Sequence, residues 1–253
     1  MIPIYRNEAA WAALSQLSIF SLERDPTLVT IVRGILEQVR REGDSALRHL
    51  AEQYGDSVPN DFQLNETQIE AALSHVSTET QQLLQRAAAN IRAFAQSVMQ
   101  TVQPVALTHH DITVGMDWRP VERVACYVPG GRYPLPSTAL MTALTAQVAG
   151  VSEIAIVSPD LQPETIYAGT LAGINRFYQL GGAQAVAAMA YGTESIPRVD
   201  MLIGPGNVYV TEAKRQVQGI LGIDMLAGPS EVAIIADAGA NPEWVAWDLL
   251  AQA

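Results

Sequence analysis

Four loops rich in glycine and proline follow apolar runs of the sequence and carry the chemistry of an anion-binding site. They are residues 129–131 (Pro-Gly-Gly), 181–182 (Gly-Gly), 204–206 (Gly-Pro-Gly) and 228–229 (Gly-Pro). Glycine lets the backbone approach a ligand closely, and N–H groups at the start of a helix attract anions such as a pyrophosphate. Each loop alone is explained more simply as a tight turn between a strand and a helix. Four such loops at one edge of a sheet predict a ligand site.

Neither of the two common nucleotide-binding motifs is complete in these loops. Gly204 and Gly206 begin the pattern G-x-G-x-x-G, but Tyr209 stands where its third glycine belongs. The phosphate-binding loop that ends in Gly-Lys-Ser/Thr is also missing, because Lys214, the only lysine, lies two turns into a predicted helix. A bound cofactor would therefore be held through other contacts, and the spacing alone does not name it.

Other side chains that could perform chemistry have simpler explanations. Cys126 could attack an aldehyde as a thiolate, but a cysteine inside an apolar strand is more often a small buried residue. Glu212 and Glu231 lie near the glycine loops and could act as bases, although capping, or pairing with Arg215, is favoured.

All four histidines lie in the N-terminal half of the chain. We expect His49 and His75 to be surface residues, because their helices have polar neighbours around them. The pair His109-His110 lies in a polar connection, and the sequence supplies no third ligand beside it. No metal site is therefore predicted from these residues.

The elements that must position the glycine loops alternate between strands and helices. The strands VACYV, EIAIVS, FYQL and DMLI precede helices predicted at residues 137–149, from 163, at 183–191 and at 208–221. A further strand, VAIIADA at residues 232–238, leads into a helix that begins near Pro242. This alternation predicts an α/β fold with a Rossmann-like, mostly parallel sheet and helices on both faces. Right-handed crossovers then place every strand-to-helix loop at the same edge.

The residues before this sheet are predicted to be mainly helical. Helical periodicity and capping residues indicate helices from Pro26, from Asp44, over residues 66–74 and over residues 77–99, all with a scaffold role. Alternation from Ile112 to Trp118 predicts a half-buried strand. We therefore divide the chain into a helical region, residues 1–104, which packs on a Rossmann-like α/β region, residues 105–253.

Composition excludes several classes of function. The formal net charge of −11 at pH 7 argues against nucleic acid and anionic membranes as partners, since both favour clusters of Lys and Arg. A single cysteine allows no intrachain disulfide and fits a reducing compartment. No segment has the length and apolar composition of a membrane span or of a signal peptide. These features predict a cytoplasmic protein.

From Val124 onward the sequence resembles histidinol dehydrogenases. The motifs that carry the resemblance occur in order: YVPGG, GGAQAVAAMAYGTE, GPGNVYVTEAKRQV, IDMLAGPSEV and DLLAQA. The resemblance implies an aldehyde-dehydrogenase-like architecture with a second Rossmann-like domain that begins near residue 232 and is incomplete. It also implies oxidation of L-histidinol to L-histidine through an aldehyde, with two NAD molecules, a bound zinc ion and a homodimeric protein.

Individual residues of these motifs match family positions of known role. The resemblance implies that Tyr127, Gln184 and Asn207 contact NAD, that Ser230 binds substrate, and that Gln252 binds both substrate and zinc. In the family, Ala-Glu-His follows this glutamine, and the remaining zinc ligands and a Glu-His acid–base pair lie further downstream. We therefore expect no catalytic residue in this chain and no activity of the chain alone. The alternative is a non-catalytic remnant that binds a nucleotide or dimerises.

Overall fold

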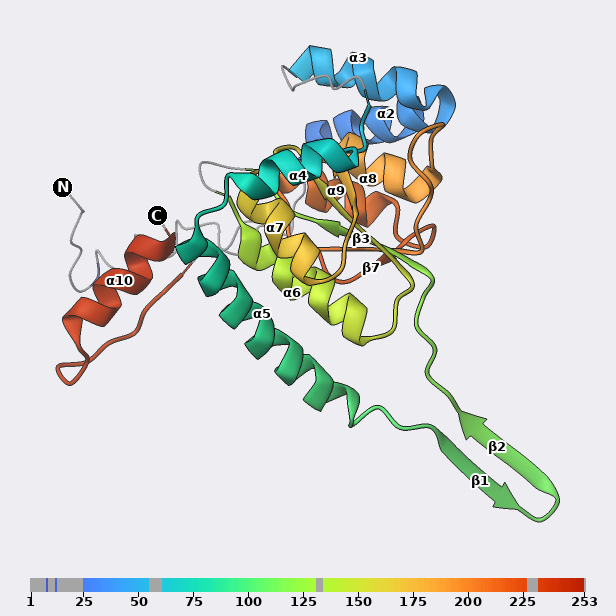
Figure 1. Ribbon diagram of the computed structural model, residues 1–253, viewed down its shortest axis with the longest axis vertical. Helices are drawn as coiled ribbons and strands as arrows, with labels where there is room; N and C mark the ends of the chain where they lie inside the picture. Colours follow the sequence, from blue (N-terminus) through green and yellow to red (C-terminus); the bar gives the residue numbers. More distant parts are fainter. Residues whose placement is uncertain are drawn as a thin grey trace.

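The computed structural model describes residues 8, 12, 25–54, 61–130, 134–226 and 232–252 (Figure 1). Its helices are α2 (Pro26–Glu42), α3 (Asp44–Tyr54), α4 (Glu66–Ser74), α5 (Thr78–Met99), α6 (Pro136–Val148), α7 (Pro163–Leu171), α8 (Gly182–Tyr191), α9 (Val208–Gln216) and α10 (Pro242–Gln252). Its strands are β1 (Val105–His109), β2 (Ile112–Met116), β3 (Arg123–Tyr127), β4 (Glu153–Ser158), β5 (Arg176–Gln179), β6 (Met201–Ile203) and β7 (Gly222–Ile223).

Strands β3 to β7 form one parallel sheet in the order β5-β4-β3-β6-β7. From β3 the chain adds β4 and β5 on one side, then returns to the other side of β3 to add β6 and β7. The helices that follow β3 and β6, namely α6 and α9, pack on opposite faces of the sheet. The loops after these two neighbouring strands therefore diverge, which opens a crevice at the carboxyl edge. The predicted α/β fold is confirmed.

The core lies on both faces of the sheet because successive side chains of β3 point to opposite faces. Val124 and Cys126 pack with α6 and α7, whereas Ala125 and Tyr127 pack with α2, α8 and α9. Each of the four is at most 3% exposed. Helices α4 and α5 form an outer layer on α7 and α6 (Figure 1). A strand buried on both faces is a continuous apolar run, so VACYV is recognisable from sequence.

Helices α2 and α3 pack on the face opposite α5 and reach the carboxyl edge of the sheet. Asp25 caps α2 by accepting a hydrogen bond from the Thr27 N–H at 2.8 Å. Two bonds fasten the corner between α2 and α3 to the loop after α8: the Asp44 N–H donates to Glu194 at 2.7 Å, and the Ser195 hydroxyl donates to Asp44 at 3.0 Å. The residues of α2 that pack toward α8 and α9 are Val32, Ile35, Leu36 and Val39.

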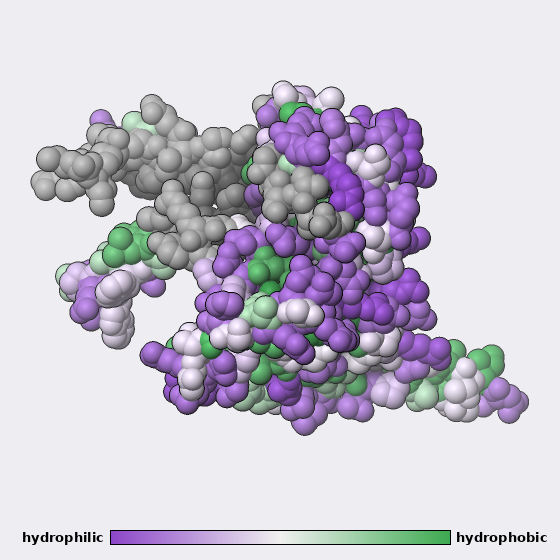
Figure 2. Space-filling view, turned by 45° about the horizontal axis from the view of Figure 1, so that its top comes forward, coloured by the Kyte–Doolittle hydropathy of each residue, from purple (hydrophilic) through white to green (hydrophobic). Residues whose placement is uncertain are grey.

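Strands β1 and β2 form a separate antiparallel hairpin that projects from the body of the molecule (Figure 1). Every residue of both strands is exposed, and apolar atoms gather along this projection in Figure 2. The prediction of a strand in this region is confirmed, but the prediction that it is half-buried is wrong. The alternation gives the hairpin an apolar side, yet among the described residues no second layer covers that side.

Two further expectations near the C-terminal end differ from the structure. Residues 232–238 form no strand, and Ile235 is fully exposed. A strand needs a neighbour to pair its N–H and C=O groups, and no other strand in the described part of the chain pairs with this segment. Helix α9 ends at Gln216 rather than near residue 221, because the chain turns there to add β7. Helix α10 lies at its predicted place, and the division at residue 104 stays a prediction.

Among the described residues, no helix combines the length and the apolar character that crossing a bilayer requires.

Candidate functional site

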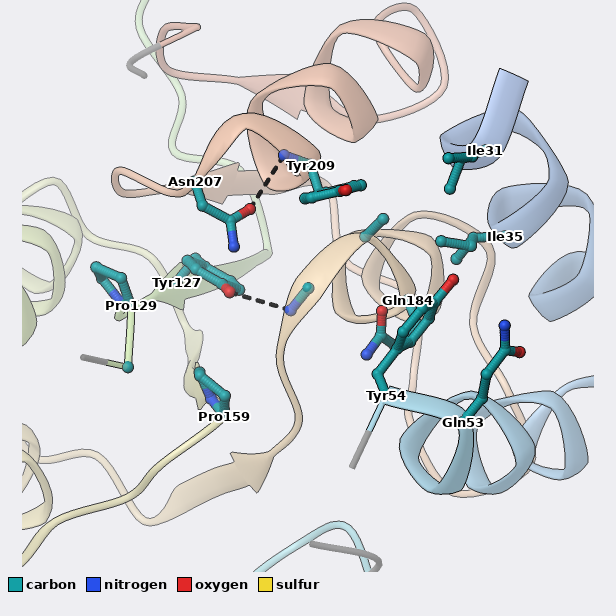
Figure 3. Close-up of a pocket in the computed structure, with 13 residues that line it drawn as sticks. Ile31, Ile35, Gln53, Tyr54, Tyr127, Pro129, Pro159, Gln184, Asn207 and Tyr209 are labelled. Carbon is teal, nitrogen blue, oxygen red and sulfur yellow. Dashed lines mark hydrogen bonds between the residues drawn. The ribbon is translucent and has the colours of Figure 1, made fainter. Parts of the chain in front are cut away.

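A cavity of about 650 Å³ lies at the carboxyl edge of the sheet, beside the switch point between β3 and β6 (Figure 3). Its size is that of a small-molecule or cofactor site. Loops after four strands line it with Tyr127, Pro129, Gly130, Pro159, Gly182, Ala183, Gln184, Asn207 and Tyr209. The cavity therefore lies at the edge where the sequence predicts a ligand site. Three of the four glycine-rich segments border this cavity, directly or through the next residue, and the fourth, residues 228–229, lies outside the described residues.

Asn207 comes directly after the Gly-Pro-Gly loop and is the N-cap of α9. Its side-chain oxygen accepts hydrogen bonds from the N–H groups of Tyr209 at 3.1 Å and Val210 at 3.0 Å. Because both partners are donors, the oxygen must face the helix, and Figure 3 places the amide nitrogen toward the cavity. Asn207 therefore presents a hydrogen-bond donor to a ligand. The sequence alone left both directions of hydrogen bonding open.

Tyr127, the last residue of β3, connects two of the loops. Its hydroxyl oxygen accepts a hydrogen bond from the Gly182 N–H, the first residue of α8, at 3.1 Å (Figure 3). Tyr127 is only 3% exposed, so little of its ring is open for stacking. Its contact with Gly182 holds the start of α8 at the cavity wall. Tyr127 therefore offers a ligand a polar or edge contact rather than the face of its ring.

The amino end of α8 forms the next part of the wall. Gly182, Ala183 and Gln184 line the cavity, and the N-cap residue Gly181 has no side chain that could cap the helix, although Tyr127 accepts from the first N–H. Gln184 is 3% exposed, so its position is fixed by packing. Backbone N–H groups and the helix dipole make such an end favourable for a negatively charged group.

Glycine is required where these loops approach one another. Gly204 has a φ of +113°, and a Cβ at this position would overlap the carbonyl oxygen of Tyr127. A Cβ on Gly130 would come within 2.7 Å of the Pro159 ring. The loops after β3, β4 and β6 are therefore in close contact, and any larger residue at Gly204 or Gly130 would separate them.

The opposite wall comes from the N-terminal helices, which sequence reasoning assigned to a scaffold. Ile31 and Ile35 of α2 and Gln53 and Tyr54 of α3 line the cavity (Figure 3). Ile31 is 40% exposed and Tyr54 is 50% exposed, which is high for such large side chains on otherwise buried helix faces. Exposed apolar area next to the predicted ligand edge indicates that these residues belong to the site. This indication needs the tertiary fold, because the sequence alone does not place α2 and α3 at that edge.

No charged side chain is among the described residues that line the cavity. Its polar groups are amides, phenols and backbone atoms, together with two isoleucines and two prolines. Such a surface fits a ligand with flat rings and neutral hydrogen-bonding groups, with any anionic part directed to the start of α8. It does not resemble a pocket for a multiply charged small anion.

The remaining candidate residues from the sequence are Cys126, Glu212 and Glu231, and the structure describes the first two. Burial raises the pKa of the Cys126 thiol to about 12, so it is not a nucleophile at neutral pH. The Glu212 carboxylate accepts two hydrogen bonds from the Arg215 guanidinium, at 2.8 Å and 2.5 Å, and these bonds raise the pKa of Arg215. The predicted pairing of Glu212 is therefore confirmed. Glu231 lies outside the described residues.

The residues predicted to bind substrate and metal are Ser230 and Gln252. Ser230 lies outside the described residues, and of Gln252 only the backbone, in the last turn of α10, is described. Within the described part of the chain, no three side chains of His, Cys, Asp or Glu lie close enough together to hold a metal ion. The described residues therefore do not form a zinc site, and the roles of Ser230 and Gln252 stay predictions.

The family profile and the relatives that match this chain all carry the same family description. Residues 21–253 match the family profile described as histidinol dehydrogenase. The chain is 43% identical over 231 residues to histidinol dehydrogenase of Methanocaldococcus jannaschii, covering 89% of this chain and 54% of that protein. It is 45% identical over 228 residues to histidinol dehydrogenase of Syntrophotalea carbinolica, covering 88% and 53%. The chain thus spans about half the length of the curated relatives that it matches.

Comparison with solved structures agrees. The crystal structure of histidinol dehydrogenase from Elizabethkingia anophelis matches with a TM-score of 0.84 at 38% sequence identity. The match covers 98% of this chain and 57% of that chain. The arrangement of the sheet, the N-terminal helices and the hairpin is therefore similar to that of the corresponding part of a longer protein.

Proposed function

Because the chain belongs to the histidinol dehydrogenase family, we propose that its described loops form the nucleotide-binding part of an NAD-dependent enzyme that oxidises L-histidinol to L-histidine through histidinaldehyde. This would be the last step of histidine biosynthesis. The observation that carries the proposal is the uncharged cavity at the switch point, where the three residues assigned to NAD by resemblance, Tyr127, Gln184 and Asn207, line one wall. When bound, NAD would accept a hydride from the carbon that is oxidised.

The residues present suit the parts of a dinucleotide. The Asn207 amide offers a donor to a carbonyl, ring nitrogen or ribose oxygen, because its own oxygen is engaged by α9. The start of α8 favours the negatively charged pyrophosphate, and none of the described residues in the cavity wall has an acidic side chain to oppose it. Gly204 and Gly130 let the loops close together beneath the ligand.

The wall from α2 and α3 has a second role in this proposal. Ile31, Ile35 and Tyr54 present apolar area opposite the loops, so a planar ring between them would be shielded from water. Exclusion of water strengthens the hydrogen bonds that position the ligand.

Substrate and metal chemistry depend on residues that the structure does not describe. Ser230 and Gln252 would orient L-histidinol, and Gln252 would contribute one oxygen to zinc. An amide oxygen alone is a weak zinc ligand without imidazole or thiolate partners. The described residues offer no such group of partners, so they do not hold zinc by themselves. A homodimer and a cytoplasmic location remain expectations from the resemblance and the composition.

A second candidate function is a non-catalytic nucleotide-binding module. It is favoured by one observation, namely that the cavity is closed on opposite sides by described residues of this chain. Both proposals predict that the chain binds NAD, and they differ in turnover.

The test is calorimetric titration of the purified chain with NAD, followed by an assay for histidinol-dependent NADH formation with added zinc. We expect NAD binding and no turnover by the 253-residue chain, and turnover by a protein of the relatives' full length that contains it. Absence of NAD binding by both proteins would overturn the nucleotide proposal. NAD binding without turnover by the longer protein would favour the non-catalytic module.

A further inference from the structure

Lys214, the only lysine of the chain, is completely buried beneath the Gly-Pro-Gly loop. Its ammonium group donates to the carbonyl oxygen of Gly204 at 2.7 Å, to Asp224 at 2.6 Å and to the carbonyl oxygen of Met225 at 3.1 Å. An ammonium group has three N–H donors, and these three acceptors account for all of them. Lys214 therefore has no donor left for a phosphate, which excludes the role of a phosphate-binding lysine.

Asp224 completes the arrangement from the other side. One carboxylate oxygen accepts from Lys214, and the other accepts from the Gly204 N–H at 2.8 Å. Both backbone groups of Gly204 are thus bound by the same ion pair, the carbonyl by Lys214 and the N–H by Asp224. Gly204 in turn lies against the Tyr127 carbonyl. The pair therefore fixes the first residue of the loop that presents Asn207.

The same lysine also holds the start of a second segment. Met225 follows β7 and leads toward the segment that contains Ser230, which the resemblance assigns to substrate. A single buried cation thus joins the nucleotide loop after β6 to the segment after β7. A buried ion pair adds little net stability over apolar residues of similar volume, but it imposes a defined geometry.

From this arrangement we propose that Lys214 is a positioning residue, which with Asp224 sets the loop from Gly204 to Asn207 at a fixed distance from residues 224–226, the described residues that follow β7. The proposal rests on the proposed function for its ligand, NAD, but not for its structural part. Without Lys214, the loop from Gly204 to Asn207 would populate several conformations. If the binding-competent one falls to a tenth of the population, NAD affinity falls about tenfold.

The experiment compares three variants with the wild-type chain. Lys214→Met removes the ammonium group and leaves Asp224 unpaired. The double variant Lys214→Met/Asp224→Leu removes both charges and therefore leaves no unpaired charge. It shows how the loss of the loop's position affects NAD binding without the stability cost of a lone carboxylate. Arg215→Met is the matched control, because it removes the neighbouring cation of α9, which pairs with Glu212 and not with the loop.

Three quantities are measured for each protein: the dissociation constant for NAD, the denaturation midpoint, and amide hydrogen exchange of residues 203–210. We expect Lys214→Met to lower the midpoint, speed exchange in this segment and weaken NAD binding about tenfold. The double variant is expected to have a denaturation midpoint close to that of the wild type, while amide exchange in the loop stays fast and NAD binding stays weak. Arg215→Met is expected to leave the loop's exchange and NAD binding as in the wild type.

A double variant that regains wild-type NAD affinity and exchange together with its stability would overturn the positioning role. If Lys214→Met does not fold, the double variant still decides whether Lys214 positions the loop or only stabilises the fold. If the wild-type chain does not bind NAD, the proposed function fails for this chain, and the exchange measurement alone then supports or overturns the inference about Lys214.

Discussion

The side-chain oxygen of Asn207 lies 3.0 Å from the backbone nitrogen of Val210 and accepts its hydrogen bond at the start of α9. This bond determines which end of the amide can meet a ligand. The cap uses the oxygen, and the –NH2 group faces the cavity (Figure 3). Helix capping and ligand binding therefore depend on different atoms of one side chain, so substitutions can separate them.

Replacing Asn207 by Asp should weaken NAD binding with little loss of stability. The carboxylate still accepts from Tyr209 and Val210, and a negative charge is favourable at a helix N-terminus. It has no donor for the ligand, however, so we expect the NAD dissociation constant to rise about tenfold. Asn207→Ala should lose both the helix cap and the donor for the ligand, and the lost cap lowers the unfolding free energy by about 1 kcal/mol. Titration calorimetry and urea denaturation measure the two effects, and unchanged NAD affinity in Asn207→Asp would contradict the assignment.

Replacing Gly204 by Ala should destabilise the chain more than the same change at Gly219. Both glycines have positive φ, +113° and +95°, so both substitutions carry backbone strain of about 1–2 kcal/mol. A Cβ at Gly219 meets nothing within 4 Å, whereas at Gly204 it would overlap the Tyr127 carbonyl. Gly204→Ala should therefore cost roughly 1–3 kcal/mol more in unfolding free energy. Equal losses in urea denaturation would show that the loops can separate without cost.

Cys126 should resist alkylation as long as the chain is folded. Burial raises the pKa of its thiol from 9.0 to about 12, so the folded state holds the proton more tightly than the unfolded state does. Its contribution to stability is complete below pH 9 and is lost as pH rises through 12. Incubation with iodoacetamide below pH 9, followed by mass spectrometry, should label the chain only when urea is added. Rapid labelling of the native chain would contradict the burial.

Features of the fold that depend on local sequence were predictable. The apolar run VACYV is buried on both faces of the sheet, and such a run is distinctive among the alternating patterns of surface strands. The Gly-Pro-Gly-Asn loop ends in a residue type that caps helices, and Asn207 does so. Since parallel strands bring their carboxyl ends to one edge, the position of the cavity followed from the order of the elements.

Features that depend on long-range contacts were not predictable. A lysine in a helix is usually solvent-exposed, and nothing near Lys214 in the sequence indicates that Asp224 and two carbonyl groups enclose it. The segment at residues 232–238 has the composition of a strand, but pairing needs a partner that local pattern does not supply. Tyr54 resembles any other residue at a helix end, and only the packing of α2 and α3 brings it to the cavity.

Replacing Tyr54 by Ala therefore tests whether the N-terminal helices belong to the site. Tyr54 is 50% exposed at the end of α3, so its removal should change stability little. If its ring packs on a ligand ring, about 0.5–1.5 kcal/mol of binding energy is lost, and the NAD dissociation constant rises roughly threefold to tenfold. Phe94→Ala on α5 is the matched control, because Phe94 is 74% exposed and does not line the cavity. Equal NAD affinity of both variants and the wild type would confine the site to the loops of the sheet.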